Sequence, residues 1–402
     1  MRPKVNEVFI PGAFPKYTYV SRESEEYEET YESRLRYCLN TAGFLTSIVG
    51  PSKTGKTVLC EKVIGLPKVV SLTGNDFKDA EDFWITLAKK VRLPLGTAFV
   101  HQESLEGEGL AGTKEARTAS RSESYGSNKD EVINFFKNND LVLVIDDFHY
   151  ATENMQYEIA YQLKDAIRYS FKAIVISLPH RSDDAIRKNG DLSGRLNLVN
   201  IEPWTPDELK EIAITGFEEL GVTINDSLVT SMAQESLSSP QLMQSNCLNL
   251  GLLREDDPNI DLETLNVEIL NKTYKRTSLN HLTYQEVARK IKAGPYTRGK
   301  TRKSYTTIHN GITADIYELV VKAIAVDPPT VRLSTDEMKQ RIDSLIEKAE
   351  DKPERKKIVN TIQQIQNIIN TSEQMYQVFE YKDEQIYILE PLFLFYLRWG
   401  KL

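Results

Sequence analysis

The sequence predicts an α/β fold in which a mainly parallel sheet carries helices on both faces, followed by a helical region and a smaller C-terminal domain. Two patterns lead to this fold class. In the first half of the chain, short apolar runs of strand length alternate with helix-compatible segments, which is typical of a parallel sheet. After Trp204 the apolar residues take helical spacing, and the chain ends in three helix-like segments and a two-stranded hairpin.

The composition is that of a soluble globular protein. The chain has 402 residues, enough for two or three domains, with 40% hydrophobic and 27% charged residues. No apolar stretch approaches the ~20 residues of a membrane helix, and the N-terminus lacks the apolar core of a signal peptide. Three distant cysteines predict no structural disulfide, so we expect a cytoplasmic protein with no membrane partner.

Changes of pattern along the chain predict five segments. Residues 23–40 have the pattern of a charged helix, in which glutamates precede arginines as the helix dipole favours. The expected segments are an N-terminal arm and helix (1–40), the core that holds the sheet (41–203), a helical lid (204–270), a basic linker segment (271–310) and a winged-helix-like domain (311–402).

The first strand of the core leads into a phosphate-binding motif. An apolar run, residues 44–49, is followed by G-x-x-x-x-G-K-[ST] and then by a helix-compatible stretch. Backbone N–H groups and the positive helix end of such a loop face phosphates, Lys56 can reach the β- and γ-phosphates, and the Thr57 hydroxyl can ligate Mg²⁺. The expected contacts of ATP–Mg²⁺ are Gly50, Pro51, Ser52, Lys53, Thr54, Gly55, Lys56, Thr57 and Val58.

A second apolar strand, residues 141–145, ends in two aspartates. Asp146 is expected to hold the Mg²⁺ shell, as a Walker B aspartate does. Asp147 occupies the place where many ATPases have a glutamate that activates the attacking water. Because the aspartate side chain is shorter by one C–C bond, its carboxylate lies ~1.5 Å further back. The sequence therefore predicts an ATPase and leaves slow hydrolysis open as an alternative to fast turnover.

The C-terminal half has helical patterns and a local excess of positive charge. A capping box with proline at the first helical position, residues 205–208, opens the lid. Residues 271–303 carry ten Lys and Arg against one acid, although the net charge of the chain is −8. Helix-like segments near 315–326, 335–349 and 353–369, followed by a hairpin, have the order of a winged helix.

These motifs together resemble the AAA+ ATPases, in particular the branch of origin-recognition initiators and transposon target-selection ATPases. Bacterial members encoded in phage-defence loci are also similar. The resemblance rests on the phosphate-binding motif, on residues 143–147, on Ser193-Gly194-Arg195 and on the capped lid from Thr205 to Leu250. It covers roughly residues 25–250, with the C-terminal winged helix as a weaker match.

The resemblance implies roles for two further residues. Arg195 stands where the family carries an arginine finger, which reaches the γ-phosphate of a neighbouring subunit; the alternative is a surface arginine paired with an acid. His180 stands near the polar sensor position, which Arg181 or Ser177 could also fill. The family's lid arginine has no counterpart in residues 239–244, and this departure also favours slow turnover.

Three functions remain open on the sequence. The first is a regulatory AAA+ ATPase that forms a homo-oligomer and controls a protein effector, with antiviral defence as the setting that the resemblance suggests. The second is a loader or initiator that binds DNA through residues 271–303 and the winged helix, because local Lys and Arg can supply phosphate contacts. The third is a slowly hydrolysing nucleotide switch. No effector chemistry is visible in the sequence.

Overall fold

The computed structural model of the chain describes residues 2–77, 82–93, 129–179, 192, 194–296, 301–308, 312–371 and 378–401, with the side chain of His149 left aside. The chain forms two compact units. The sheet unit comprises Tyr31–Val49 and Leu59–Asn200, and the lid unit comprises Met1–Thr30, Gly50–Val58 and Ile201–Leu402. Among the described residues, no helix has both the length and the apolar character that spanning a membrane requires.

The sheet unit contains the predicted parallel sheet. Its five strands are parallel in the order β4-β5-β6-β3-β7, which places β6 between β3 and β5. All five residues of β3 are buried, as expected for a strand covered on both faces. The fold class predicted from the sequence is confirmed. The strands are β3 (Leu45–Val49), β4 (Val69–Thr73), β5 (Val142–Asp146), β6 (Lys172–Ser177) and β7 (Leu196–Asn200).

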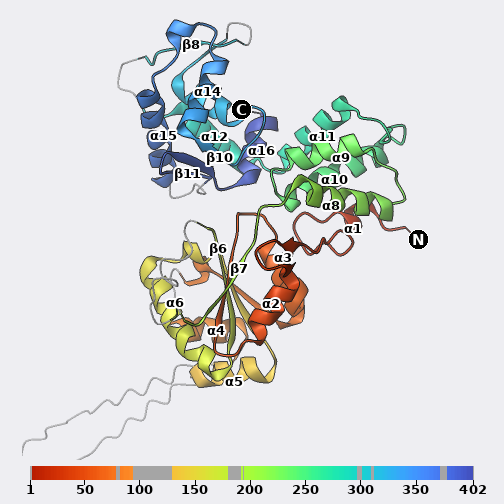
Figure 1. Ribbon diagram of the computed structural model, residues 1–402, viewed down its shortest axis with the longest axis vertical. Helices are drawn as coiled ribbons and strands as arrows, with labels where there is room; N and C mark the ends of the chain where they lie inside the picture. The colour runs from red at the N-terminus through yellow and green to blue at the C-terminus, as the bar shows by residue number, and fades with distance from the viewer. Residues whose placement is uncertain are drawn as a thin grey trace, which may run out of the picture. The chain divides into compact units, whose positions relative to one another are not determined.

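Helices lie on opposite sides of this sheet. Alternate strand residues such as Leu143, Ile145 and Val175 share one buried cluster with side chains of α4, α5 and α6. Figure 1 shows α6 on one side of the strands and α2 with α3 on the other. The elements are α2 (Tyr31–Asn40), α3 (Lys56–Ile64), α4 (Phe83–Lys90), α5 (Lys129–Asn138) and α6 (Glu153–Ala166), with short 3-10 turns η1 (Leu66–Lys68), η2 (Gly74–Phe77), η3 (Phe148–Tyr150) and η4 (Ile167–Tyr169).

The predicted charged helix over residues 23–40 is wrong in its first half. Strands β1 (Glu23–Ser24) and β2 (Glu29–Thr30) pair antiparallel, and α2 begins only at Tyr31. The acids of residues 23–29 would stand three and four positions apart on a helix, where like charges repel. The part that does form a helix has apolar side chains to bury, including Leu35 and Cys38.

The lid consists of four helices, and the N-terminal arm packs on it. Helix α8 starts with the predicted capping box: the Thr205 side chain accepts from the Glu208 N–H, and the Glu208 side chain accepts from the Thr205 N–H. A Cβ on Gly216 would come within 2.2 Å of the Phe9 ring, so the arm requires glycine there. The elements are α1 (Val5–Val8), α8 (Pro206–Glu219), α9 (Asp226–Glu235), α10 (Pro240–Asp256) and α11 (Val267–Leu279).

The C-terminal region has the predicted winged-helix order, with three helices before a hairpin. Strands β10, β12 and β11 form a small antiparallel sheet. The segment 271–310, expected as a linker, instead holds the end of α11 and all of α12, whose Val287, Ala288 and Ile291 are buried. The elements are α12 (Thr283–Ala293), β8 (Tyr305–Thr306), β9 (Thr313–Ala314), α13 (Ile316–Ile324), β10 (Arg332–Ser334), α14 (Thr335–Leu345), η5 (Ala349–Asp351), α15 (Arg355–Asn370), β11 (Phe379–Lys382), β12 (Gln385–Ile388) and α16 (Pro391–Trp399).

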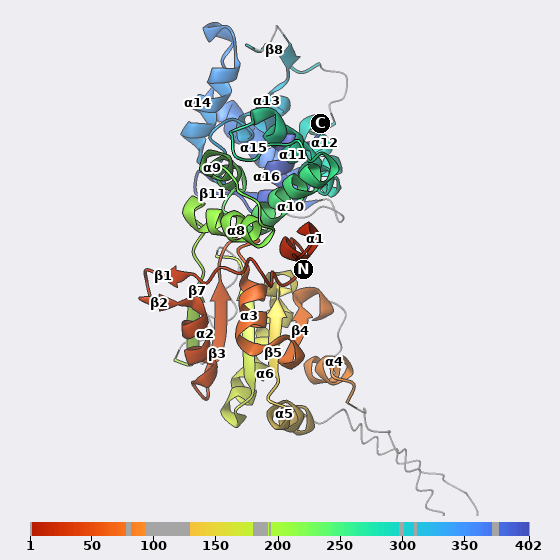
Figure 2. The same ribbon diagram turned by 90° about the vertical axis from the view of Figure 1, so that its right-hand side faces the viewer.

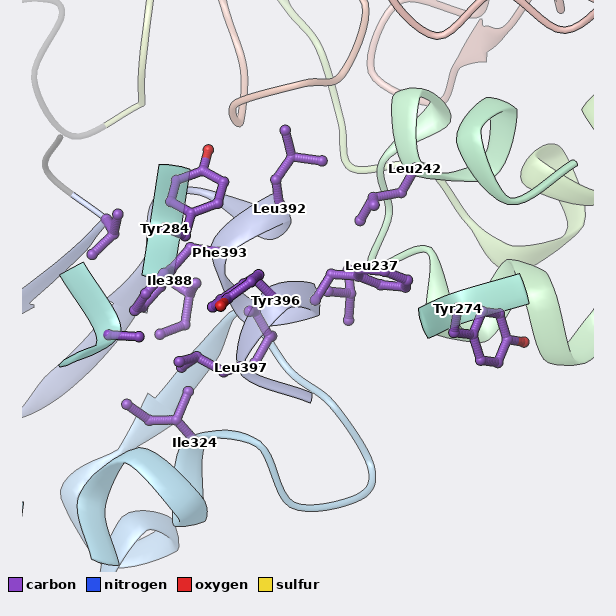
Figure 3. Packing of buried hydrophobic residues seen from close by; sticks show 14 of the residues in the cluster. Leu237, Leu242, Tyr274, Tyr284, Ile324, Ile388, Leu392, Phe393, Tyr396 and Leu397 are labelled. Atoms are coloured by element: carbon purple, nitrogen blue, oxygen red, sulfur yellow. The ribbon is translucent and has the colours of Figure 1, made fainter. Parts of the chain in front are cut away.

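The apolar C-terminal helix α16 docks on its own unit. Phe393, Leu394, Phe395 and Tyr396 are at most 1% exposed. Figure 3 shows Phe393, Tyr396 and Leu397 among side chains contributed by the winged helix, such as Ile324 and Ile388, with Tyr274 of the lid further along. The lid and the winged helix thus share one buried cluster, and the turned view in Figure 2 shows α16 close to α10 and α11.

A buried ion pair also joins the lid to α16. The Arg398 guanidinium donates to the Glu235 carboxylate through Nε (2.6 Å) and Nη2 (2.9 Å), and the Trp399 indole donates to the same carboxylate (2.6 Å). Arg398 also donates to the Ala325 carbonyl and to Asp327, both at 2.6 Å. The side chains of Arg398 and Glu235 are 8% and 11% exposed, so water screens the pair little.

Stability is expected to fall in mild acid because of His281. Burial, with the positive Lys53 side chain adding to it, lowers the pKa of His281 from 6.5 to about 4. The unfolded chain therefore binds the extra proton first, so the stabilisation is complete above about pH 6.5 and declines as the pH falls towards 4. From pH 7.5 to pH 5 we expect protonation linked to this residue to lower the free energy of unfolding by about 1–2 kcal/mol.

Denaturant unfolding at the two pH values measures this loss. His281→Gln removes the titrating group but keeps a polar side chain, and it should lose less stability than the parent over the same interval. Equal losses in parent and variant would contradict the assignment to His281.

Candidate functional site

The phosphate loop, residues 50–57, has the backbone expected of its motif. A Cβ on Gly50 would come within 2.8 Å of both the Ile201 side chain and the Ile201 carbonyl oxygen, so only glycine fits there. Gly55 has φ +88° and Lys53 has φ +62°, and a Cβ at Gly55 would meet nothing within 4 Å. Left-handed residues in such a turn gather N–H groups into an anion-binding nest. Helix α3 then begins at Lys56, as the motif predicts.

The Lys56 ammonium is held against its own loop. It donates to the carbonyl oxygens of Gly50 (2.8 Å) and Pro51 (2.6 Å), and the Thr54 hydroxyl donates to the same Pro51 carbonyl (2.9 Å). A positive group is therefore placed at the N-terminal end of α3, where the helix dipole also favours anions. The Ser52 hydroxyl donates to the Glu390 carboxylate at 3.4 Å, and a phosphate would have to replace that carboxylate because like charges repel.

The two aspartates lie at the carboxyl end of β5, at one edge of the sheet. Asp146 ends β5, and its carboxylate accepts a hydrogen bond from the Asp147 N–H (2.8 Å). Asp147 is exposed and left-handed (φ 48°), a conformation that aspartate tolerates better than most residues. Because β3 and β5 are parallel strands of one sheet, the chain leaves both at the same edge, and after β3 it continues directly into Gly50.

The negative charge of Asp146 acts on helix α3. Burial raises the pKa of the Cys60 thiol, and the nearby Asp146 carboxylate raises it further. Thr57, the other expected ligand of Mg²⁺, is the second residue of α3. An aspartate and a threonine hydroxyl are oxygen ligands of the kind that Mg²⁺ prefers. The donor set therefore fits the expected metal.

Ser177, which the sequence left open as an alternative for the polar sensor position, lies at the carboxyl end of a central strand. It ends β6 and pairs in register with Val49, the last residue before the phosphate loop. Its side chain is 2% exposed, and its hydroxyl has no hydrogen-bond partner among the described residues. Buried hydroxyls are usually paired, so an unpaired one at the carboxyl edge of the sheet is a candidate contact for a ligand.

The roles that the resemblance implies for His180 and Arg195 stay predictions. His180 and Arg181 lie outside the described residues, so their sensor role stays a prediction. Arg195 immediately precedes β7, and its carbonyl oxygen accepts from the Leu45 N–H (2.9 Å). The Arg195 side chain is half-buried and pairs with no acid among the described residues, so its finger role also stays a prediction.

Sequence reasoning missed two residues beside the phosphate loop. The Trp204 indole donates to the Thr54 carbonyl (2.9 Å), and the Arg22 guanidinium lies over the Trp204 ring, 4.7 Å from its centroid. Trp204 directly precedes the capping box, and this position was the signal that could have drawn attention to it. Arg22 gave no signal, because the hydrogen bonds that hold it join it to residues about 180 positions away.

Much of the positive charge in segment 271–303 is paired. Five of its described Lys and Arg residues form ion pairs with acids; the pairs are Arg276–Asp256, Lys290–Glu286, Lys292–Glu318, Arg302–Asp315 and Lys303–Asp351. In the first turn of α15, Arg355 pairs with Asp336 and Glu384. Paired side chains offer less net charge to nucleic-acid phosphates, so the patch is weaker than its composition suggests.

Comparisons with known proteins found similar folds only. No family model and no curated protein matches the chain. Among solved structures, Cdc6p of Pyrobaculum aerophilum is 12% identical, with 98% of this chain and 97% of that one covered and a TM-score of 0.44. A Walker-type ATPase of Pyrococcus abyssi is 13% identical, with coverage of 99% and 98% and a TM-score of 0.49. The Orc1 protein of Aeropyrum pernix, solved in complex with DNA, is 13% identical, with coverage of 98% and 95% and a TM-score of 0.44. The likeness concerns the fold alone.

Proposed function

We propose that this chain binds ATP with Mg²⁺ at the phosphate loop and hydrolyses it, as a cytoplasmic AAA+ regulatory ATPase. One observation carries the proposal. The Lys56 ammonium stands at the start of α3 in a glycine-containing loop with left-handed residues, and it donates to the carbonyl oxygens of Gly50 and Pro51 in that loop.

The residues of the chain have separable tasks in this reaction. The loop N–H groups and Lys56 would hold the β- and γ-phosphates, and Thr57 with Asp146 would hold Mg²⁺. Bound Mg²⁺ supplies neutralisation of charge on the phosphate oxygens. Asp147 would orient the attacking water, with Ser177 or His180 as the polar group nearby. The short Asp147 arm and the lid without a matching arginine favour slow turnover.

Among the possible functions of ATP binding and hydrolysis, we favour the control of a partner effector. Arg195 carries a half-buried guanidinium with no acid partner among the residues described, which suits a finger for the site of a neighbouring copy. Antiviral defence is the setting that the sequence resemblance suggests. DNA loading is less favoured, because most described cations of segment 271–303 are already paired with acids.

Particle size and phosphate release, measured on the same samples, test this function. We expect the parent to form an oligomer with ATP and Mg²⁺ and to release phosphate slowly. Asp147→Asn should keep the oligomer and lose roughly 100-fold in release rate, since a positioned base contributes about that factor or more. Asp140→Asn is the control, because this exposed aspartate pairs with Lys68 and Lys172 on the protein surface.

Each contrary result points to a different part of the proposal. A monomer under every condition would rule out the finger role of Arg195. An ATP-bound oligomer that releases no phosphate would replace the ATPase by the slowly hydrolysing nucleotide switch. Steeply salt-dependent binding of duplex DNA by the parent would favour the loader instead.

A further inference from the structure

Trp204 links the phosphate loop to the first lid helix. Its indole Nε1 donates to the Thr54 carbonyl oxygen at 2.9 Å, and the residue is 8% exposed. The next residue, Thr205, is the N-cap of α8. One side chain thus contacts the loop while its backbone enters the lid.

Arg22 of the N-terminal arm fixes the position of this tryptophan. Its guanidinium stacks over the Trp204 ring and donates to the carbonyl oxygens of Glu202 and Pro203, both at 3.1 Å. Its Nε donates to the Glu208 carboxylate at 2.8 Å. The same carboxylate accepts from the Thr205 N–H (2.7 Å) in the capping box of α8. Because Arg22 is only 7% exposed, these bonds form in a largely dry environment.

The hydrogen bond from Trp204 sets the direction of one phosphate-facing donor. The Thr54 carbonyl and the Gly55 N–H belong to one planar trans peptide, so they point in opposite directions. Gly55 has φ +88° and open space where a Cβ would stand, so its own conformation restrains this peptide little. Holding the carbonyl on Trp204 therefore keeps the Gly55 N–H turned the other way, as the nest requires.

We propose that Trp204 is a positioning residue for the phosphate loop and that, with Arg22, it couples the lid to the grip on phosphate. A movement of the N-terminus of α8 displaces Trp204, releases the Thr54–Gly55 peptide and weakens phosphate binding. Linkage is reciprocal, so bound phosphate holds α8 in place by the same factor. This inference rests on the proposed nucleotide site.

Trp204→Phe tests the inference, because phenylalanine keeps a ring for Arg22 but loses the N–H donor. Calorimetric titration with Mg²⁺–ADP and with Mg²⁺–pyrophosphate should show Kd raised roughly 3- to 10-fold for both, as expected for one lost neutral hydrogen bond. Trp84→Phe is the matched control, since its indole donates to Gln162 in the other unit. The control should bind like the parent.

The Kd and the number of binding sites per chain, measured together, distinguish a positioning role of Trp204 from a loss of folded protein. A purely structural loss would lower the number of binding sites per chain and leave Kd of the remainder unchanged, which would overturn the inference. An unchanged Kd at full stoichiometry would overturn it as well. If Trp204→Phe does not fold, Arg22→Gln takes its place with the same expected direction. A parent that binds neither probe would instead refute the proposed function itself.

Discussion

Lys56→Ala is expected to weaken the binding of ATP and ADP by at least about 30-fold while the protein stays folded. A hydrogen bond to a charged group contributes roughly 1.5–3 kcal/mol net, and the ammonium can make more than one such bond to a triphosphate. The Lys56 side chain donates to the carbonyl oxygens of Gly50 and Pro51, so the variant also leaves these acceptors without that donor. Calorimetric titration of nucleotide measures the change.

Lys53 provides a control from the same loop, because the motif assigns phosphate contact at this position to the backbone N–H and not to the side-chain ammonium. It is exposed and left-handed, and Lys53→Asn removes an equal charge while keeping a residue type that tolerates positive φ. We expect its affinity to change less than about 3-fold, because surface charges act weakly through water. Equal losses in the two variants would mean that net charge, and not the placed ammonium, attracts the nucleotide.

The parts of the fold that the sequence predicted correctly are those encoded in short stretches. Glycine spacing, a strand before the loop and a helix after it are local properties, and the backbone of Gly55 and the start of α3 agree with them. The parallel sheet was also predictable, because a strand buried on both faces is written as an uninterrupted apolar run such as residues 141–145.

The parts that the sequence did not predict depend on contacts between distant residues. The bond between Trp204 and Thr54 spans 150 positions, and no local pattern selects it among other partners. From the sequence alone, the basic segment 271–303 is interpreted as a surface of available positive charge. The acids that pair with it, such as Asp315 and Asp351, lie on other elements. Charge counts along a sequence therefore overestimate the field of a folded surface.

Breaking the buried ion pair of Glu235 and Arg398 is expected to lower the free energy of unfolding more than any other substitution considered. Glu235→Ala removes the acceptor of two Arg398 hydrogen bonds and of the Trp399 indole. Arg398 is 8% exposed and would stay charged in a place that water hardly reaches. Breaking one partner of a buried pair typically costs about 3–5 kcal/mol, more than the pair itself contributes over an apolar replacement.

Denaturant unfolding followed by intrinsic tryptophan fluorescence measures this loss, and Trp399, which donates to the same carboxylate, contributes to that signal. Arg276→Ala is the control, since Arg276 and Asp256 form an exposed pair whose loss should cost no more than about 1 kcal/mol. The joint replacement of Glu235 by Gln and Arg398 by Met should recover much of the stability, because it leaves no buried unpaired charge. If Glu235→Ala unfolds at the same denaturant concentration as the parent, then Asp327 and the Ala325 carbonyl suffice for Arg398, and the lid and α16 are held together by apolar packing alone.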